Sequence, residues 1–442
     1  MFSQIPPPGG APAPRRSRRL ASIAALVGLV TGLATPAATR VYDAVAVRGA
    51  QFIPEADIRQ TCAAEPGLDY QDAELRAIET CLMSTGAFER VTLFAENRTL
   101  VIDVQELNTR PGRLDASLGY ASQDGVLASL AFERYNLFDR TFGALSLDYS
   151  PSVQRATANL YRTEAFGGAL DLGVETVAGR LAYGDLGYVH EAIRTETYLA
   201  WPVSPATRLE AGLGFRDHRL GEVDSGASVL LLAEETDGIA APYLRFGISR
   251  DRAAGSGWRD PGYALHLTQY FWNIGSEDPL SDTRVHARLH LPLTPQVRLL
   301  TGVDASSVTG MKGNDTRAID RFFPGADSFR GFAPRGIGPR DGENALGGNR
   351  FVKASVELQR DFGEVFKVPL QGGVFVDAGA SWGLDATLGG AIDDDWHLRS
   401  TIGAALNFDV NGTPAAVYLA TPLAQEAGDE TQLIGLSLRA SF

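Results

Sequence analysis

The chain has 442 residues, a formal net charge of −13 and an apolar content of 44%. No apolar run beyond the N-terminus approaches the roughly 20 residues that a membrane-spanning helix needs, which excludes a helical membrane protein. The acidic balance, with only three lysines, excludes a nucleic-acid surface built from clustered basic side chains. The 48 glycines and 21 phenylalanines suit either a membrane β-barrel or a large soluble β-sandwich.

The N-terminus has the pattern of a secretory signal. Four arginines within residues 15–19 precede the almost wholly apolar stretch from Leu20 to Ala34, and small residues follow up to Ala38. A positive segment followed by a short apolar segment is typical of a signal peptide. We therefore expect one over residues 1–38, with the cleavage bond left open. A membrane anchor is the alternative, although the apolar segment is short for a span.

Residues 39–108 predict a small unit with the element order β-α-α-β-β. Pro54 and the acidic residues after it indicate the start of a helix, and Leu75, Ile78 and Leu82 repeat with helical spacing. The expected elements are a strand over residues 41–47, helices from Pro54 and over Asp69–Met83, and a hairpin of strands 91–95 and 100–104. The strand 91–95 is expected at an edge of the sheet, where an extended segment of another protein could pair with it.

Cys62 and Cys81 are the only cysteines, and both lie in this small unit. In an exported protein an isolated, even pair favours a disulfide. Two buried free thiols are the alternative that the sequence leaves open. Two cysteines with no histidine nearby make a poor metal site, so no metal is expected there.

From Arg113 onward apolar and polar residues alternate. Three segments show this most clearly, at residues 113–121, 352–359 and 434–442. A period of two with one apolar face is typical of a membrane-spanning strand, whose other face points into the barrel lumen. A soluble sandwich has the same period, but the signal peptide and the terminal Phe442 favour the membrane barrel. The predicted fold class is mainly β: a transmembrane antiparallel barrel preceded by one small domain.

Several motifs carry a specific family resemblance. The small unit resembles a POTRA domain through Val47-Arg48-Gly49, Thr85-Gly86-Ala87-Phe88 and Val101-Ile102-Asp103-Val104. The chain as a whole, over residues 41–442, resembles the BamA/TamA surface-antigen superfamily of barrel-assembly proteins, through Tyr135–Phe138, Arg321–Phe332, Leu346–Asn349, Val374–Gly379 and Phe442. The resemblance implies a periplasmic POTRA-like domain at 39–108. It also implies an outer-membrane barrel of about 16 strands at 109–442, with a lumenal loop around 321–350.

The resemblance further implies that the loop folds into the lumen and that Arg330 meets acids on the inner wall. Carried over to this chain, those acids are Asp377 and Glu357. The strand phase places both independently on the inward face. Arginine paired with carboxylates gives strong, charge-assisted hydrogen bonds. The predicted loop latch comprises Arg330, Gly331, Phe332, Glu357 and Asp377, with Phe329 as the alternative to Phe332 for filling an apolar pocket.

The second predicted functional element is the seam between the first and last strands, near residues 113–123 and 432–442. Gly119 and Gly435 bring no side chains to this seam, which suits a junction that opens; easing of strand curvature is the alternative. The last strand, ending at Phe442, also resembles the terminal signal by which barrels are themselves recognised.

Other chemistry is weakly indicated. His286 and His290 lie on one strand face with Arg288, rather than on a zinc-binding helix. No Gly-x-Ser-x-Gly elbow is expected, because the match at Gly379–Gly383 continues a segment of strand alternation and not a strand-to-helix turn, which argues against an enzyme of the hydrolase type. We expect no catalytic residues, no metal and no cofactor.

The leading functional hypothesis is an outer-membrane assembly factor. It would capture strands of unfolded barrel or autotransporter-like client proteins and template them at the seam. The alternatives are a pore-forming protein-secretion transporter, and a passive channel or surface antigen without clients. Expected partners are the client proteins, outer-membrane lipids and accessory periplasmic or inner-membrane proteins. A single POTRA-like domain suggests a specialised member.

Overall fold

The computed structural model describes residues 40–441, except residues 51–52, 54, 63, 65, 68, 71, 86, 107–111, 122–124, 139, 169, 185, 205, 236–237, 253–260, 366–367 and 411–412. The predicted signal peptide and Phe442 therefore lie outside the described residues. The chain divides into two compact units, Met1–Gly112 and Arg113–Phe442.

The small unit is a three-stranded sheet with two helices. Its sheet has the order β2-β5-β4, so β4 is an edge strand. Ile58 and Leu82 of the helices pack with Leu100 and Ile102 of the central strand, and all four are at most 1% exposed. The elements are β1 (Arg40–Val41), β2 (Ala44–Arg48), α1 (Glu55–Thr61), β3 (Asp69–Tyr70), α2 (Asp72–Ser84), β4 (Phe88–Glu96) and β5 (Thr99–Glu106).

One boundary in this unit differs from the prediction. The second helix was expected from Asp69, but Asp69 and Tyr70 pair with Val41 and Arg40 as a short two-stranded sheet. The helix begins only at Asp72. The helical period continues back through this segment in the sequence, whereas the backbone pairing with a distant strand decides its conformation.

A disulfide joins Cys62, directly after α1, to Cys81 within α2. The Cα atoms of the two cysteines are 6.0 Å apart, and 19 positions separate them along the chain. The bridge therefore ties together the two helices that contribute Ile58 and Leu82 to the core of this unit.

Loss of this bridge is expected to destabilise the small unit. Cys62→Ala/Cys81→Ala should lower its free energy of unfolding by about 3 kcal/mol, the usual effect of opening a loop of this length. The measurement is urea-dependent proteolysis of the full chain, followed by detection of fragments of the small unit. Thr80→Ala, a substitution on the exposed side of α2, is the control and should leave the midpoint unchanged. Equal midpoints for the double variant and the control would contradict the prediction.

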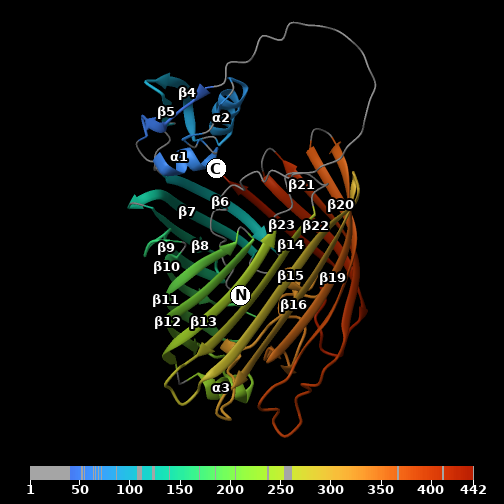
Figure 1. Ribbon diagram of the computed structural model, residues 1–442. Helices are drawn as coiled ribbons and strands as arrows, with labels where there is room; N and C mark the ends of the chain where they lie inside the picture. The colour runs from blue at the N-terminus through green and yellow to red at the C-terminus, as the bar shows by residue number, and fades with distance from the viewer. Residues whose placement is uncertain are drawn as a thin grey trace, which may run out of the picture. The chain divides into compact units, whose positions relative to one another are not determined.

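The second unit is a closed antiparallel barrel, in which sixteen strands of the described residues pair in a ring and β23 returns to β6 (Figure 1). The strands are β6 (Gly112–Ala121), β7 (Gly125–Phe138), β8 (Thr141–Tyr149), β9 (Val153–Arg162), β10 (Asp171–Leu181), β11 (Val189–Ser204), β12 (Thr207–Gly221), β13 (Ile239–Arg252), β14 (Gly262–Trp272), β15 (Leu280–Thr294), β16 (Val297–Gly310), β19 (Arg350–Val365), β20 (Val368–Trp382), β21 (Arg399–Val410), β22 (Thr413–Ala424) and β23 (Ile434–Ser441). The predicted fold class is confirmed.

Side chains alternate between the two faces of the barrel wall. On β20, Val374 and Val376 are 59% and 42% exposed on the outer face, whereas Phe375 and Asp377 are 1% and 0% exposed on the inner face. The apolar outer face and the charged inner face are the expected arrangement for strands surrounded by lipid. Among the described residues, no helix is long and apolar enough to cross a membrane.

The longest loop of the barrel, residues 311–349, connects β16 to β19. It contains two short 3-10 turns, η1 (Ala318–Asp320) and η2 (Ala326–Ser328), and a small hairpin of β17 (Arg340–Asp341) and β18 (Asn344–Ala345). Another loop, between β12 and β13, carries the short helix α3 (Val229–Glu234). Leu231 of α3 packs with Ala318 and Leu346 of the long loop, and all three are fully buried. The loops at this end of the barrel thus form a core of their own.

Candidate functional site

Arg330, at the tip of the long loop, contacts the inner wall of the barrel through two carboxylates. Its Nε and Nη2 donate to the two oxygens of Asp377, at 3.0 Å each, and its Nη1 donates to Oε2 of Glu357 at 2.6 Å. Asp377 lies on β20 and Glu357 on the neighbouring β19. The side chains of Arg330 and Glu357 are 17% and 10% exposed, and that of Asp377 is fully buried. The structure thus brings together the three charged residues of the predicted latch.

The two acids have further partners that the sequence did not point to. Lys353 places Nζ 3.4 Å from Oδ2 of Asp377, and Ser355 donates to Oδ1 of the same carboxylate at 2.6 Å. Gln359 donates its amide to Oε1 of Glu357 at 2.7 Å. Arg330 and Lys353 together balance Asp377 and Glu357, so the cluster is neutral when the loop is seated. A buried cluster without net charge avoids the cost of an unpaired ion.

The aromatic ring of Phe375 lies against the guanidinium group of Arg330. The Cζ atom of Arg330 lies 3.4 Å from the centroid of the Phe375 ring, which is 1% exposed. A guanidinium over a ring face gains electrostatic attraction, and more so where water is excluded. Phe375 precedes Asp377 by two positions on β20, so the ring and the carboxylate point to the same side of the strand.

Gly331 and Phe332 fit the loop closely to the wall. Gly331 has φ +96°, and a Cβ atom there would lie 2.8 Å from Cγ2 of Thr401 on β21, so both the backbone conformation and the space require glycine. Phe332 is fully buried and packs edge to face with Phe329, with ring centroids 5.2 Å apart. Both phenylalanines therefore fill the apolar pocket, together with Phe351 of β19.

The loop has a second anchor of opposite polarity. Asp320 of η1 accepts a hydrogen bond from Nη1 of Arg216 on β12, at 2.8 Å, and the two side chains are 2% and 3% exposed. Arg216 also donates to Asn273 at 2.9 Å and lies over the ring of Trp272. Here the loop supplies the acid and the wall supplies the arginine. The strand β12 is six positions away from β20 around the barrel, so the two anchors hold the loop to different parts of the wall.

Sequence reasoning did not identify the Arg216–Asp320 pair. The alternation of the strand places Arg216 on the inward face, and position 320 is acidic. No pattern in the neighbouring sequence indicates that these two residues meet. The two residues are 104 positions apart. Only a contact across the closed barrel brings them together.

The seam glycines are placed differently from one another. Gly119 of β6 lies opposite Arg439 of β23 and is therefore at the seam, as expected. Gly435 lies opposite Tyr418 of β22, on the other side of β23. Residues 122–124, towards which the register of β23 with β6 continues, lie outside the described residues, so the place of Gly435 at the seam stays a prediction. A Cβ atom at Gly435 would lie 2.0 Å from the Tyr418 ring, so the absence of a side chain accommodates this ring. Phe442 lies outside the described residues.

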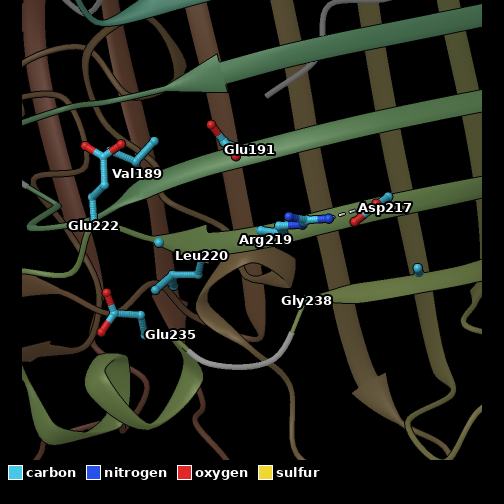
Figure 2. Close-up of a pocket in the computed structure, with 10 residues that line it drawn as sticks. Val189, Glu191, Asp217, Arg219, Leu220, Glu222, Glu235 and Gly238 are labelled. Atoms are coloured by element: carbon cyan, nitrogen blue, oxygen red, sulfur yellow. Dashed lines mark ion pairs between the residues drawn. The ribbon is translucent and has the colours of Figure 1, made fainter.

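A separate polar pocket, with a volume of about 480 Å³, lies at the ends of β11, β12 and β13 (Figure 2). Glu191, Asp217, Glu222 and Glu235 line it together with Arg219, whose Nη2 lies 3.6 Å from Asp217. None of the predicted latch or seam residues lines this pocket. It is distinct from the contacts that hold the loop.

The described residues contain no group of three or more histidine, cysteine or acidic side chains arranged to hold a metal ion. His286 pairs with Asp304 at 2.6 Å on the strand face that the alternation indicated. The contacts that hold the loop are charge pairs and hydrogen bonds.

A closed barrel with an apolar outer face and a loop anchored inside it defines an outer-membrane β-barrel protein. The model of the Omp85 superfamily domain matches residues 110–442. The chain belongs to the Omp85 superfamily, and the predicted BamA/TamA-like resemblance and outer-membrane location are confirmed.

Two curated relatives carry the name outer membrane protein assembly factor BamA. The protein from Neorickettsia risticii is 24% identical over 389 residues, which cover 84% of this chain and 51% of that protein. The protein from Nitratidesulfovibrio vulgaris is 24% identical over 353 residues, covering 76% of this chain and 44% of that protein. The chain therefore spans about half the length of the curated relatives it matches.

Solved structures show the same fold. BamA from Haemophilus ducreyi lacking POTRA domains 1–3 has a TM-score of 0.76 at 18% identity, over 91% of this chain and 85% of that one. CdiB from Escherichia coli has a TM-score of 0.56 at 12% identity, over 94% and 93% of the two chains. These likenesses concern the fold alone.

Removal of the loop arginine is expected to release the loop. Arg330→Ala leaves Asp377 and Glu357 with Lys353 as the remaining cation of the cluster, which should lower the stability of the folded barrel by about 3 kcal/mol. The measurement is the temperature at which the unboiled protein loses its fast, folded migration in gel electrophoresis. Arg330→Lys keeps the charge without the two-pronged contact and should fall between Arg330→Ala and the unaltered protein. Equal transition temperatures for all three would contradict the latch.

Proposed function

We propose that this protein is an outer-membrane assembly factor that inserts, or helps to secrete, other β-rich proteins. In this proposal the edge of the small unit captures an extended client segment, and the seam of the barrel then templates the client strand. Neither step uses a nucleotide or a cofactor. The loop latch holds the barrel in its closed form.

The main support is the seam itself, where the last strand of the barrel closes on the first. β23 pairs with β6 from Ser437–Ala121 to Ser441–Ser117. Opening of this pairing would free the backbone groups along one edge of β6. Unpaired backbone groups are costly in lipid and readily pair with another strand. This edge of β6 is therefore the proposed template.

The edge strand β4 supports the capture step. β4 pairs with β5 along one side, from Phe88–Glu106 to Glu96–Thr99, and it ends the sheet order on the other. An extended peptide that adds to such an edge gains main-chain hydrogen bonds while its side chains alternate between the two faces. Phe94, on the same strand, is 40% exposed and offers apolar contact.

The relatives support the assembly role through their names, and the match covers about half of each relative. Client proteins, outer-membrane lipids and accessory periplasmic or inner-membrane proteins are its proposed partners.

Locking the seam is expected to abolish activity. Leu118 and Ala440 are direct partners across the seam, so Leu118→Cys/Ala440→Cys should form a bridge there under oxidising conditions. The matched control is Ala354→Cys/Ala378→Cys, a direct pair of β19 and β20 far from the seam. The measurement is folding of a client barrel in proteoliposomes, with and without reductant. Activity should disappear only in the oxidised seam variant and return on reduction. Full activity of the locked seam would refute templating.

Depletion tests the function itself. Removal of the protein from cells should lower the abundance of a subset of outer-membrane β-barrel proteins, measured by quantitative mass spectrometry of the outer membrane. Unchanged abundance of every such protein would contradict the assembly function and favour a passive channel or surface antigen.

A pore-forming secretion transporter is the second candidate, because the lumen is lined by charged side chains such as Arg245 and Glu196, paired at 2.7 Å. It would show large conductance in planar bilayers after Arg330→Ala.

A further inference from the structure

The long loop is bonded to the segment that leads into the last strand. Ala333 donates its backbone N–H to the carbonyl of Glu430 at 2.8 Å, and Gln432 donates to the carbonyl of Gly331 at 3.1 Å. These bonds flank an antiparallel bridge between Phe332 and Thr431. The loop residues directly after Arg330 therefore pair with backbone that lies just before Ile434, where β23 begins.

Two more contacts extend this pairing. Glu430 donates its N–H to the carbonyl of Gly336 at 2.8 Å, and its side chain forms an ion pair with Arg340. On its other side, the same segment is tied to the wall, because Asp429 accepts two hydrogen bonds from Arg399 at the start of β21. Residues 429–432 are thus held between the loop and the barrel wall.

Side chains give a second, independent connection between Arg330 and β23. The Phe375 ring below Arg330 meets the Tyr418 ring edge to face, with centroids 6.3 Å apart. The Tyr418 ring in turn covers Gly435 of β23, where a Cβ atom would lie 2.0 Å away. These contacts run from Arg330 through Phe375 of β20 and Tyr418 of β22 to Gly435, near the beginning of β23. The strands β20 to β23 are successive in the barrel (Figure 1).

We propose that the seated loop positions the beginning of β23, so that the Arg330 contacts and the seam strand loosen together. Arg330 fixes the loop, residues 331–336 hold residues 430–432, and these lead into the strand that closes on β6. Because coupling between two sites is reciprocal, loosening the segment 430–432 should also loosen the loop. The proposal rests on the proposed function for its use, since a seam held by the loop opens only when the loop is released.

Hydrogen exchange of the full chain in lipid nanodiscs, read by mass spectrometry, tests the coupling. Arg330→Ala should raise exchange of amides in residues 430–438 together with those of the loop, by about tenfold, which corresponds to about 1.4 kcal/mol of local stability. Asp320→Asn weakens the other anchor and should raise exchange near residue 320 alone. Faster exchange in the loop with unchanged exchange in residues 430–438 would overturn the proposal.

A pair of proline variants keeps the test decisive if Arg330→Ala fails to fold. Gln432→Pro removes the N–H that donates to Gly331, whereas Thr431→Pro alters a residue whose N–H points away from the loop in this type of bridge. Exchange should rise in both the loop and β23 for Gln432→Pro and in neither for Thr431→Pro. Equal exchange in the two variants, or a rise in β23 alone, would overturn the coupling.

These readouts need no client protein. If exchange rises together in the loop and in β23 but depletion lowers no outer-membrane protein, the coupling stands and the proposed function is rejected. If depletion lowers client proteins but exchange in β23 does not follow the loop, the function stands and the coupling is rejected.

Discussion

Closure of the strand ladder is the constraint on which the rest of this structure depends. In lipid each backbone N–H and C=O needs a partner within the protein, so the sheet returns from β23 to β6. Closure turns every second side chain into the lumen. Charges there are paired with one another, as Arg245 is with Glu196 and Glu210. The same wall offers the long loop its charged partners.

Two buried ion-pair anchors fix the loop to the inner wall, in addition to its apolar packing and its contacts with other loops. Arg330 meets wall acids on β19 and β20, and Asp320 meets a wall arginine on β12. A buried charge that loses its partner is costly, so each anchor holds its own part of the loop against the wall. Gly331 lets the backbone of the loop approach the wall closely, and the two buried phenylalanines fill an apolar pocket beside the charged residues. The seated loop then reaches the segment before β23, which connects the anchors to the seam.

Much of the candidate site was predictable from the sequence. The alternation placed Glu357 and Asp377 on the inward face, and the Arg-Gly-Phe motif supplied their partner. Lys353 and Phe375 were missed, although both lie on that inward face. The alternation shows to which side of a strand a side chain points, but not which side chains of other strands lie next to it. The Tyr418 ring over Gly435 was missed for a related reason. A residue in the last strand of a barrel opposes a neighbour on each side, and only the pairing register shows which residues these are.

By itself the sequence determined the strand period, the inner and outer faces, the small domain ahead of the barrel and the motif at the tip of the loop. These are local or periodic features, so neighbouring residues are enough to specify them. The tertiary structure alone decided which charges meet and which backbone segments pair. Arg216 and Asp320 meet across 104 positions, and Phe332 pairs with Thr431. Such contacts exist only after the sheet closes, because closure sets the distances between strands that are remote along the chain.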